Sequence, residues 1–152
     1  MPAWLKALHV VFRDRVLLGG PSLPLYEVEP PSWLAGKRIE CDGGWSRGAL
    51  SLMDLGRAAK EADPLCVWGL NFSITRSEFE TCGGFHPDIA PKELQRYQGD
   101  EEIGLCHKIK FRGLRAMYHP GAAVTHVIPA TRLTPISFEQ RGFYQGVCEL
   151  LH

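Results

Sequence analysis

Three consecutive acidic residues, Asp100, Glu101 and Glu102, stand where a helix is expected to begin. A helix N-terminus favours negative charge by about 0.3–1 kcal/mol, and a cap explains one acid, usually the first. Three adjacent carboxylates repel one another, which makes it easier for one of them to accept a proton. The cluster is therefore interpreted as a helix cap, or as a general-base site in which one acid takes a proton from a substrate.

A second group of polar and aromatic residues lies in the apolar run 66–74, which is interpreted as a strand interrupted at Gly69. A glycine inside a strand lets a ligand or another backbone approach closely. Asn71 can donate and accept hydrogen bonds, and the flat ring of Trp68 suits stacking on a sugar. The structural interpretation, a core tryptophan beside a bulge, fits these residues about equally well.

Two further residues each have a structural and a functional interpretation. Arg76 pairs with a phosphate or with Glu78 or Glu80 on the surface. His126 follows an apolar stretch near the end of a predicted strand, which is typical of a half-buried histidine bonded to a backbone carbonyl.

The elements that must position these residues follow from turn and capping signals. A capping box at Thr75 and Glu78 predicts a short helix that ends at Gly83-Gly84, and a second helix is expected near 100–112 with Gly113 as its stop. Elsewhere the sequence predicts a buried strand at 15–18, an extended loop at 21–31, a turn at 43–44, a helix or loop at 53–63, strands at 115–119 and 122–128, and a last helix from 134.

Composition limits the classes of protein to which this chain can belong. The 152 residues, with 45% hydrophobic and 22% charged side chains, are enough for one domain with a core. Seventeen basic and seventeen acidic residues cancel, so nothing points to nucleic acid. No apolar run reaches the roughly 18–20 residues of a transmembrane segment, and no signal peptide is recognised. Five scattered cysteines without a C-x-x-C pair favour reduced thiols in a cytoplasmic protein.

The order of the motifs resembles a known family. It is carried by Gly69-Leu70-Asn71, Gly83-Gly84-Phe85, Glu101-Glu102, Gly113, Tyr118-His119-Pro120 and His126. In this order they resemble the second half of the catalytic domain of family 2 glycosyltransferases, which have the GT-A fold. The resemblance implies an α/β class: a partial, Rossmann-like GT-A domain over residues 1–152, with a mixed β-sheet flanked by helices.

The resemblance also implies an activity, namely transfer of a sugar from a nucleotide-diphosphate donor to a hydroxyl acceptor with inversion. Such enzymes serve polysaccharide or glycolipid assembly, in the cytoplasm or peripherally at the inner face of the membrane. One acid of the family's Glu-Asp motif is the general base. Alignment from Gly113 makes this Glu102, whereas alignment on the apolar turn 103–105 favours Asp100; Glu101 lies between them.

The remaining site roles follow from the same resemblance. His126 would ligate a divalent metal, Mn²⁺ or Mg²⁺, on the donor diphosphate, and a neutral imidazole suits manganese better. His86, in a loop after Phe85, would face the acceptor. Trp68, Gly69, Asn71 and Arg76 would contact the donor sugar, acceptor or phosphate.

The family's first half, with its nucleotide-binding strands and Asp-x-Asp motif, has no counterpart in this sequence. We therefore expect an inactive fragment that self-associates or needs a partner supplying that half. Two rival functions stay open. One is a non-catalytic carbohydrate-binding or assembly module; the other is a metal-dependent hydrolase using Asp100, Glu102, His86 and His126.

Overall fold

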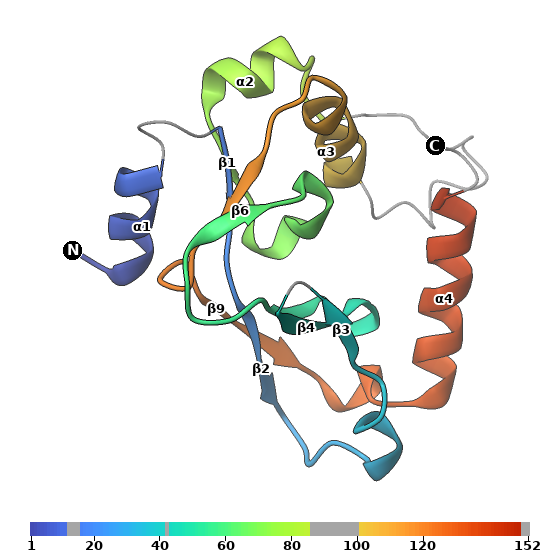
Figure 1. The fold of residues 1–152 in the computed structure, drawn as a ribbon. Coiled ribbons are helices and arrows are strands. Elements are labelled where there is room, and N and C mark those ends of the chain that lie inside the picture. Colours follow the sequence, from blue (N-terminus) through green and yellow to red (C-terminus); the bar gives the residue numbers. More distant parts are fainter. Residues whose placement is uncertain (12–15, 42, 86–100, 150–152) are drawn as a thin grey trace.

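The computed structural model describes residues 1–11, 16–41, 43–85 and 101–149. It confirms the α/β class, but the strands form two mixed sheets rather than one (Figure 1). The helices are α1 (Ala3–Val11), α2 (Arg76–Thr81), α3 (Glu101–Phe111) and α4 (Pro135–Glu149). Short 3₁₀ turns join them: η1 (Ser32–Leu34), η2 (Gly48–Leu50), η3 (Pro64–Cys66), η4 (Gly69–Asn71) and η6 (Ala130–Arg132).

The four-stranded sheet has the order β6-β8-β1-β7, and the five-stranded sheet the order β3-β4-β5-β2-β9. The strands are β1 (Leu17–Gly19), β2 (Ser22–Tyr26), β3 (Ile39–Cys41), β4 (Gly44–Arg47), β5 (Leu52–Asp54), β6 (Lys60–Ala62), β7 (Ser73–Ile74), β8 (Ala116–Tyr118) and β9 (Val124–Ile128). The pairs β1–β8 and β2–β9 are parallel, and the other described pairs are antiparallel.

Two chain segments cross together from one sheet to the other. β1 runs into β2 through Gly20 and Pro21, and β8 runs into β9 through residues 119–123 (Figure 1). The two backbones touch at the crossing: a Cβ on Gly20 would lie 2.4 Å from the Ala122 carbonyl oxygen. Only glycine fits this close approach.

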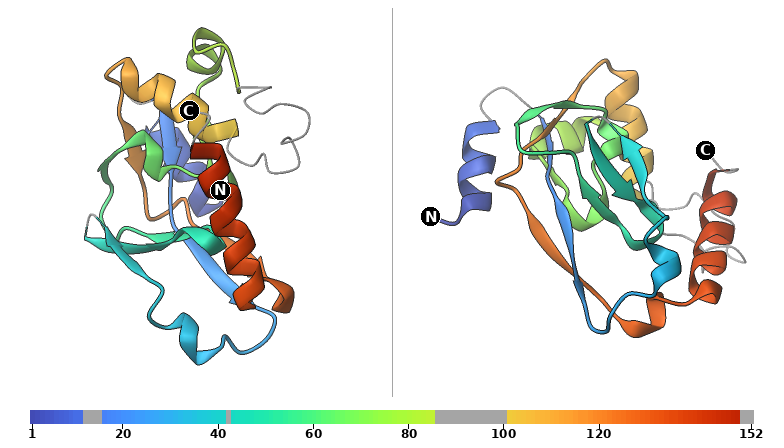
Figure 2. Two further views of the ribbon diagram at one scale, coloured as in Figure 1. Left: turned by 90° about the vertical axis from the view of Figure 1, so that its right-hand side faces the viewer. Right: turned by 60° about the horizontal axis from the view of Figure 1, so that its bottom comes forward.

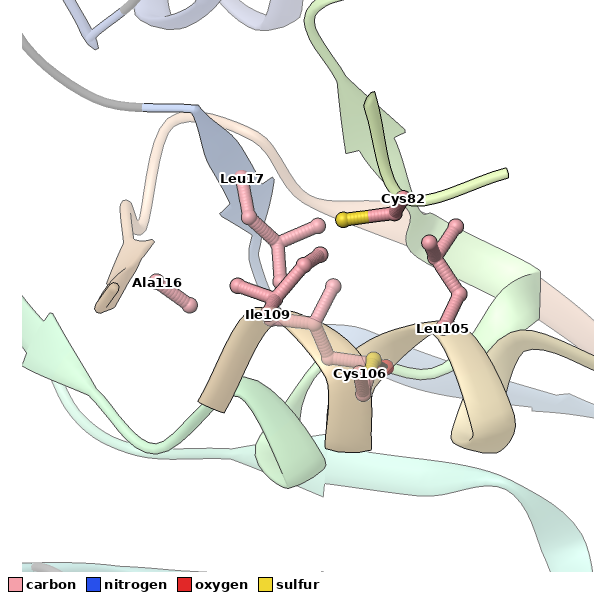
Figure 3. Packing of buried hydrophobic residues seen from close by; sticks show 7 residues of the cluster. Leu17, Cys82, Leu105, Cys106, Ile109 and Ala116 are labelled. Carbon is pink, nitrogen blue, oxygen red and sulfur yellow. Dashed lines mark hydrogen bonds between the residues drawn. The ribbon is translucent and has the colours of Figure 1, made fainter. Parts of the chain in front are cut away.

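Helices cover both faces of the four-stranded sheet. α3 packs Leu105, Cys106 and Ile109 against Leu17 on one face (Figure 3). α1 packs against Leu18 on the other face. α1 and α4 lie at opposite sides of the molecule (Figure 2).

Most predicted helices and strands are confirmed, among them the helix stops, because Gly83, Gly84 and Gly113 all have positive φ values of 72–75°. The capping box is wrong, since Thr75 is the N-cap residue of α2 but makes no side-chain bond to the helix. Residues 21–31 are extended as expected, yet their first half joins the sheet as β2.

Two predictions for the middle of the chain are wrong. In the run 66–74, Cys66 ends the 3₁₀ turn η3, Gly69–Asn71 form η4, and only Ser73–Ile74 pairs in a sheet. Asp63 accepts a hydrogen bond from Leu65 N at 3.0 Å, with Pro64 between them, so the chain turns instead of extending. The segment 53–63 is neither helix nor plain loop, because it contributes β5 and β6.

One face of the five-stranded sheet keeps apolar side chains in solvent. Leu25 and Val127 are register partners on β2 and β9 and are 56% and 50% exposed, with Leu23 also exposed. β9 is also an edge of its sheet. Among the described residues, no helix combines the length and apolarity needed to span a bilayer.

Candidate functional site

A hollow of about 320 Å³ joins residues that are far apart in the sequence. Trp68 and Glu102, two residues predicted from sequence, both line it. The other lining residues come from η2 and the residue after it, from α3 and from α4: Gly48, Ala49, Ser51, Ile103, Phe138, Arg141, Gly142 and Gln145. Its volume lies at the lower end of small-molecule sites, which span about 300–1,000 Å³.

The first turn of α3 is held in place by the buried core beneath it. Leu105, Cys106 and Ile109 are at most 1% exposed, and the Cys106 thiol lies 3.7 Å from the Val67 carbonyl oxygen (Figure 3). Lys110 Nζ also contacts Asp63 Oδ2 at 2.6 Å. These contacts fasten α3 to the segment that carries Trp68, and so set the position of Glu102 beside it.

Gly69 and Glu102 are in direct contact. The Gly69 N–H donates to Glu102 Oε1 at 3.0 Å. A Cβ at Gly69 would lie 2.9 Å from the Glu102 carboxyl carbon, so the absence of a side chain makes room for this carboxylate. Gly69 therefore acts through Glu102: its N–H orients one carboxylate oxygen and leaves the other to accept a second bond.

Asn71 is placed as a structural clamp at the crossing of the two sheets. Its amide Nδ2 donates to Pro21 O at 3.2 Å and Ala122 O at 2.7 Å, and Trp4 Nε1 lies 3.3 Å from its Oδ1. The side chain is buried, and both amide hydrogens are used within the protein. This arrangement favours a structural role over the substrate contact predicted from sequence.

Replacing Asn71 by alanine is expected to lower the free energy of unfolding by about 2–3 kcal/mol. The substitution leaves two buried carbonyl oxygens without their donor, and each unsatisfied group costs about 1–3 kcal/mol. Urea unfolding followed by circular dichroism measures the change. Gln140→Ala, an exposed change on α4, should stay within about 0.5 kcal/mol. A loss as small as that control's for Asn71→Ala would contradict the clamp.

The other residues predicted for the site lie elsewhere or outside the described part of the chain. Arg76 is 91% exposed on α2 and pairs with Glu80 at 2.8 Å, as one of its two interpretations expected. His86 and Asp100 lie outside the described residues, and Glu101 is described only as the first residue of α3. Glu102 is thus the acid of the cluster whose side chain can be placed.

His126 lies on β9 and does not line the hollow itself; it is linked to the hollow through Arg132 and the lining residue Ala49. Arg132 Nη1 is 3.4 Å from His126 Nε2, and Arg132 Nη2 donates to the carbonyl oxygen of Ala49, a lining residue, at 3.0 Å. A guanidinium group only donates, so Nε2 of His126 is the acceptor and the imidazole proton is assigned to Nδ1. Burial lowers the pKa of His126, the Arg132 charge lowers it further, and the Leu50 backbone opposes both.

The lowered pKa of His126 predicts a loss of stability in acid. Between the folded pKa and the ordinary value of 6.5, the unfolded chain binds the proton more readily. This contribution to stability is therefore complete above pH 6.5 and is lost as the pH falls below it. Unfolding in urea at pH 7.5 to 5 should show a weaker pH dependence for His126→Gln than for the native chain, whereas Gln140→Ala, which removes no titratable group, should match the native dependence. Equal slopes for both variants would contradict this assignment.

A metal does not fit His126 with the neighbours that the structure describes. Its Nε2 faces a cation, and no group of three or more histidine, cysteine, aspartate or glutamate side chains within the described ranges converges on a metal position. The divalent metal stays a prediction from the resemblance.

Sequence reasoning missed the contribution of α4. Arg141 and Gln145 line the hollow, but their segment was predicted only as a last helix from residue 134, with no role in a site. Arg141 and Gln145 are four residues apart and therefore lie on one face of a helix, which was the signal available in the sequence. Comparison with protein-family models, with curated proteins and with solved structures found no match to this chain.

Proposed function

We propose that the chain carries the acceptor side of a glycosyltransferase site, in which a sugar passes from a nucleotide diphosphate to a hydroxyl group. One observation carries the proposal: Trp68 and Glu102 line the same hollow, and Arg141 lines it as well. An aromatic ring for a sugar face, a carboxylate for a proton and a cation for phosphate are the groups this reaction needs.

The reaction is a direct displacement. Glu102 takes the proton from the acceptor hydroxyl through its second carboxylate oxygen, while Oε1 stays bonded to Gly69 N–H. The acceptor oxygen forms a bond to the anomeric carbon as the bond from that carbon to the diphosphate oxygen breaks. The electron pair leaves with the nucleoside diphosphate, and the configuration at the anomeric carbon inverts.

The proposal includes a second polypeptide segment that binds the nucleoside. The described residues that line the hollow belong to helices, turns and loops, and they include no strands that could bind a base and ribose. Free sheet edges at β7 and β9, and the exposed Leu25 and Val127, offer surfaces where such a segment or a second copy can add. We place the protein in the cytoplasm or at the inner face of the membrane, where nucleotide sugars are made.

Gly69→Ala tests the placement of the base. The new Cβ meets the end of a flexible side chain, so the fold should persist while the Glu102 carboxylate is displaced and loses its N–H donor. We expect the rate of sugar transfer to fall by about tenfold to a hundredfold, since misplacement of about 1 Å has effects of that size. The assay follows release of UDP or GDP from a panel of nucleotide sugars, with extract fractions supplying acceptor and partner.

Gly146→Ala is the matched control, because it lies on α4 outside the hollow and its Cβ would meet nothing within 4 Å. Its transfer rate should equal that of the native chain. Unchanged transfer in Gly69→Ala would contradict the role given to Glu102. Sugar binding without nucleotide binding or transfer, in a folded native chain, would favour the carbohydrate-binding module.

A further inference from the structure

Two arginines lie at or beside the hollow: Arg141 on α4 lines it, and Arg132 in η6 bonds to its lining residue Ala49. Arg132 is fixed by its bonds to Ala49 O and His126 Nε2, and Arg141 lines the hollow itself. Both are half-buried. Burial lowers the pKa of Arg132, and the charge of Arg141 lowers it further.

This pair lacks the compensation that arginines in a structural role usually have. Among the described residues, neither Arg132 nor Arg141 makes an ion pair, and Arg141 makes no hydrogen bond either. Arg47 shows the contrast: it is more deeply buried than either, and its three bonds go to Leu34 O, Lys37 O and Tyr26 OH, which hold the loop around η1. Arg141 has no such hydrogen bonds within the part of the chain that the structure describes.

The charges around the hollow are consistent with an anionic ligand. Glu102 is the acid and Arg141 the cation among its described lining residues, and Arg132 adds a second guanidinium group bonded to the lining residue Ala49. Guanidinium charges that make no ion pair with a carboxylate are stabilised when an anion binds beside them. Guanidinium groups are well suited to phosphate, because they donate several hydrogen bonds in a fixed plane.

We propose that Arg141, supported by Arg132, binds the paired phosphates of a diphosphate ligand and neutralises their charge without a divalent metal. That the diphosphate belongs to a nucleotide sugar rests on the proposed function. Arg141 contacts the phosphate directly. Arg132 is a positioning residue that also adds charge, since its hydrogen bonds to Ala49 and His126 keep it against the wall.

Calorimetric titration of the full chain with inorganic pyrophosphate in EDTA tests this proposal. We expect saturable binding that weakens with added salt, and inorganic phosphate should bind more weakly than pyrophosphate. Arg141→Gln should raise the Kd for pyrophosphate by about tenfold to a hundredfold, because it removes charged hydrogen bonds. Arg76→Gln, on the exposed surface of α2, should leave the Kd unchanged.

Absence of binding in EDTA by a folded chain, or equal binding by Arg141→Gln and the native protein, would overturn the proposal. The two proposals fail differently. Arg141-dependent pyrophosphate binding without transfer from any nucleotide sugar would keep the anion site and remove the glycosyltransferase. Sugar transfer that needs added metal and is indifferent to Arg141→Gln would keep the glycosyltransferase and remove the anion site.

Discussion

Replacing Glu102 by glutamine is expected to lower the rate of sugar transfer by about 10²–10⁴-fold, the range typical for loss of a general base. Glutamine is nearly isosteric, and its amide oxygen can still accept the bond from Gly69 N–H that Glu102 Oε1 receives at 3.0 Å. The fold and the pocket should therefore be retained. Only the ability to take a proton from the acceptor disappears.

The measurement is kcat for donor turnover with saturating acceptor, together with circular dichroism of both proteins. Glu80→Gln is the matched control, since Glu80 is an exposed acid on α2 that pairs with Arg76. Its kcat should be unchanged. Full activity in Glu102→Gln would remove Glu102 as the base and return the role to Asp100 or Glu101.

Replacing Gly20 by alanine should lower the free energy of unfolding by about 3 kcal/mol or more. The Cβ would lie 2.4 Å from Ala122 O and 2.8 Å from both Ala122 C and His119 O, all of them backbone atoms. Backbone cannot move aside as a side-chain end can, and overpacking costs about 1–3 kcal/mol even where the surroundings yield. The parallel segments would have to separate at the point where the chain crosses between sheets.

Thermal and urea unfolding of Gly20→Ala and Gly36→Ala measure this effect. A Cβ on Gly36 would meet nothing within 4 Å, so that variant controls for the change of residue type. It should stay within about 0.5–1 kcal/mol of the native protein. If Gly20→Ala and Gly36→Ala are equally stable, the close crossing of the two segments does not exist in solution.

Local signals were enough to predict the elements that carry the site. The α3 helix over Glu101–Phe111 follows from its apolar positions and from Gly113, whose φ of 72° ends it. Both kinds of signal depend on neighbouring residues, so they can be read from the sequence without the fold. That is why Glu102 was predicted at the start of a helix and is found there.

Residues whose role depends on distant contacts could not be assigned in this way. Asn71 bonds to carbonyl groups 50 and 51 residues away in the chain. Nothing in its neighbourhood distinguishes such a clamp from a ligand contact. The same holds for Arg141, which reaches the hollow only because α4 packs beside the η2 turn, about 90 residues earlier.

The interpretation of 66–74 as a strand failed for a different reason. Its apolar residues suit either a strand or a series of turns, and Asp63-Pro64 was the deciding signal. Because the segment turns at η3 and η4, Trp68 lines the hollow and Gly69 meets Glu102. The turn that contradicted the prediction is therefore also what brings the two predicted site residues together.

The most direct test of the account is calorimetric titration of the purified full chain with UDP and GDP, in EDTA and then with Mn²⁺, for the native protein and Arg141→Gln. The account predicts saturable binding by the native chain, through the diphosphate that both nucleotides carry, and weaker binding by a folded Arg141→Gln variant. No binding of either nucleotide by a folded native chain, with and without metal, would contradict it.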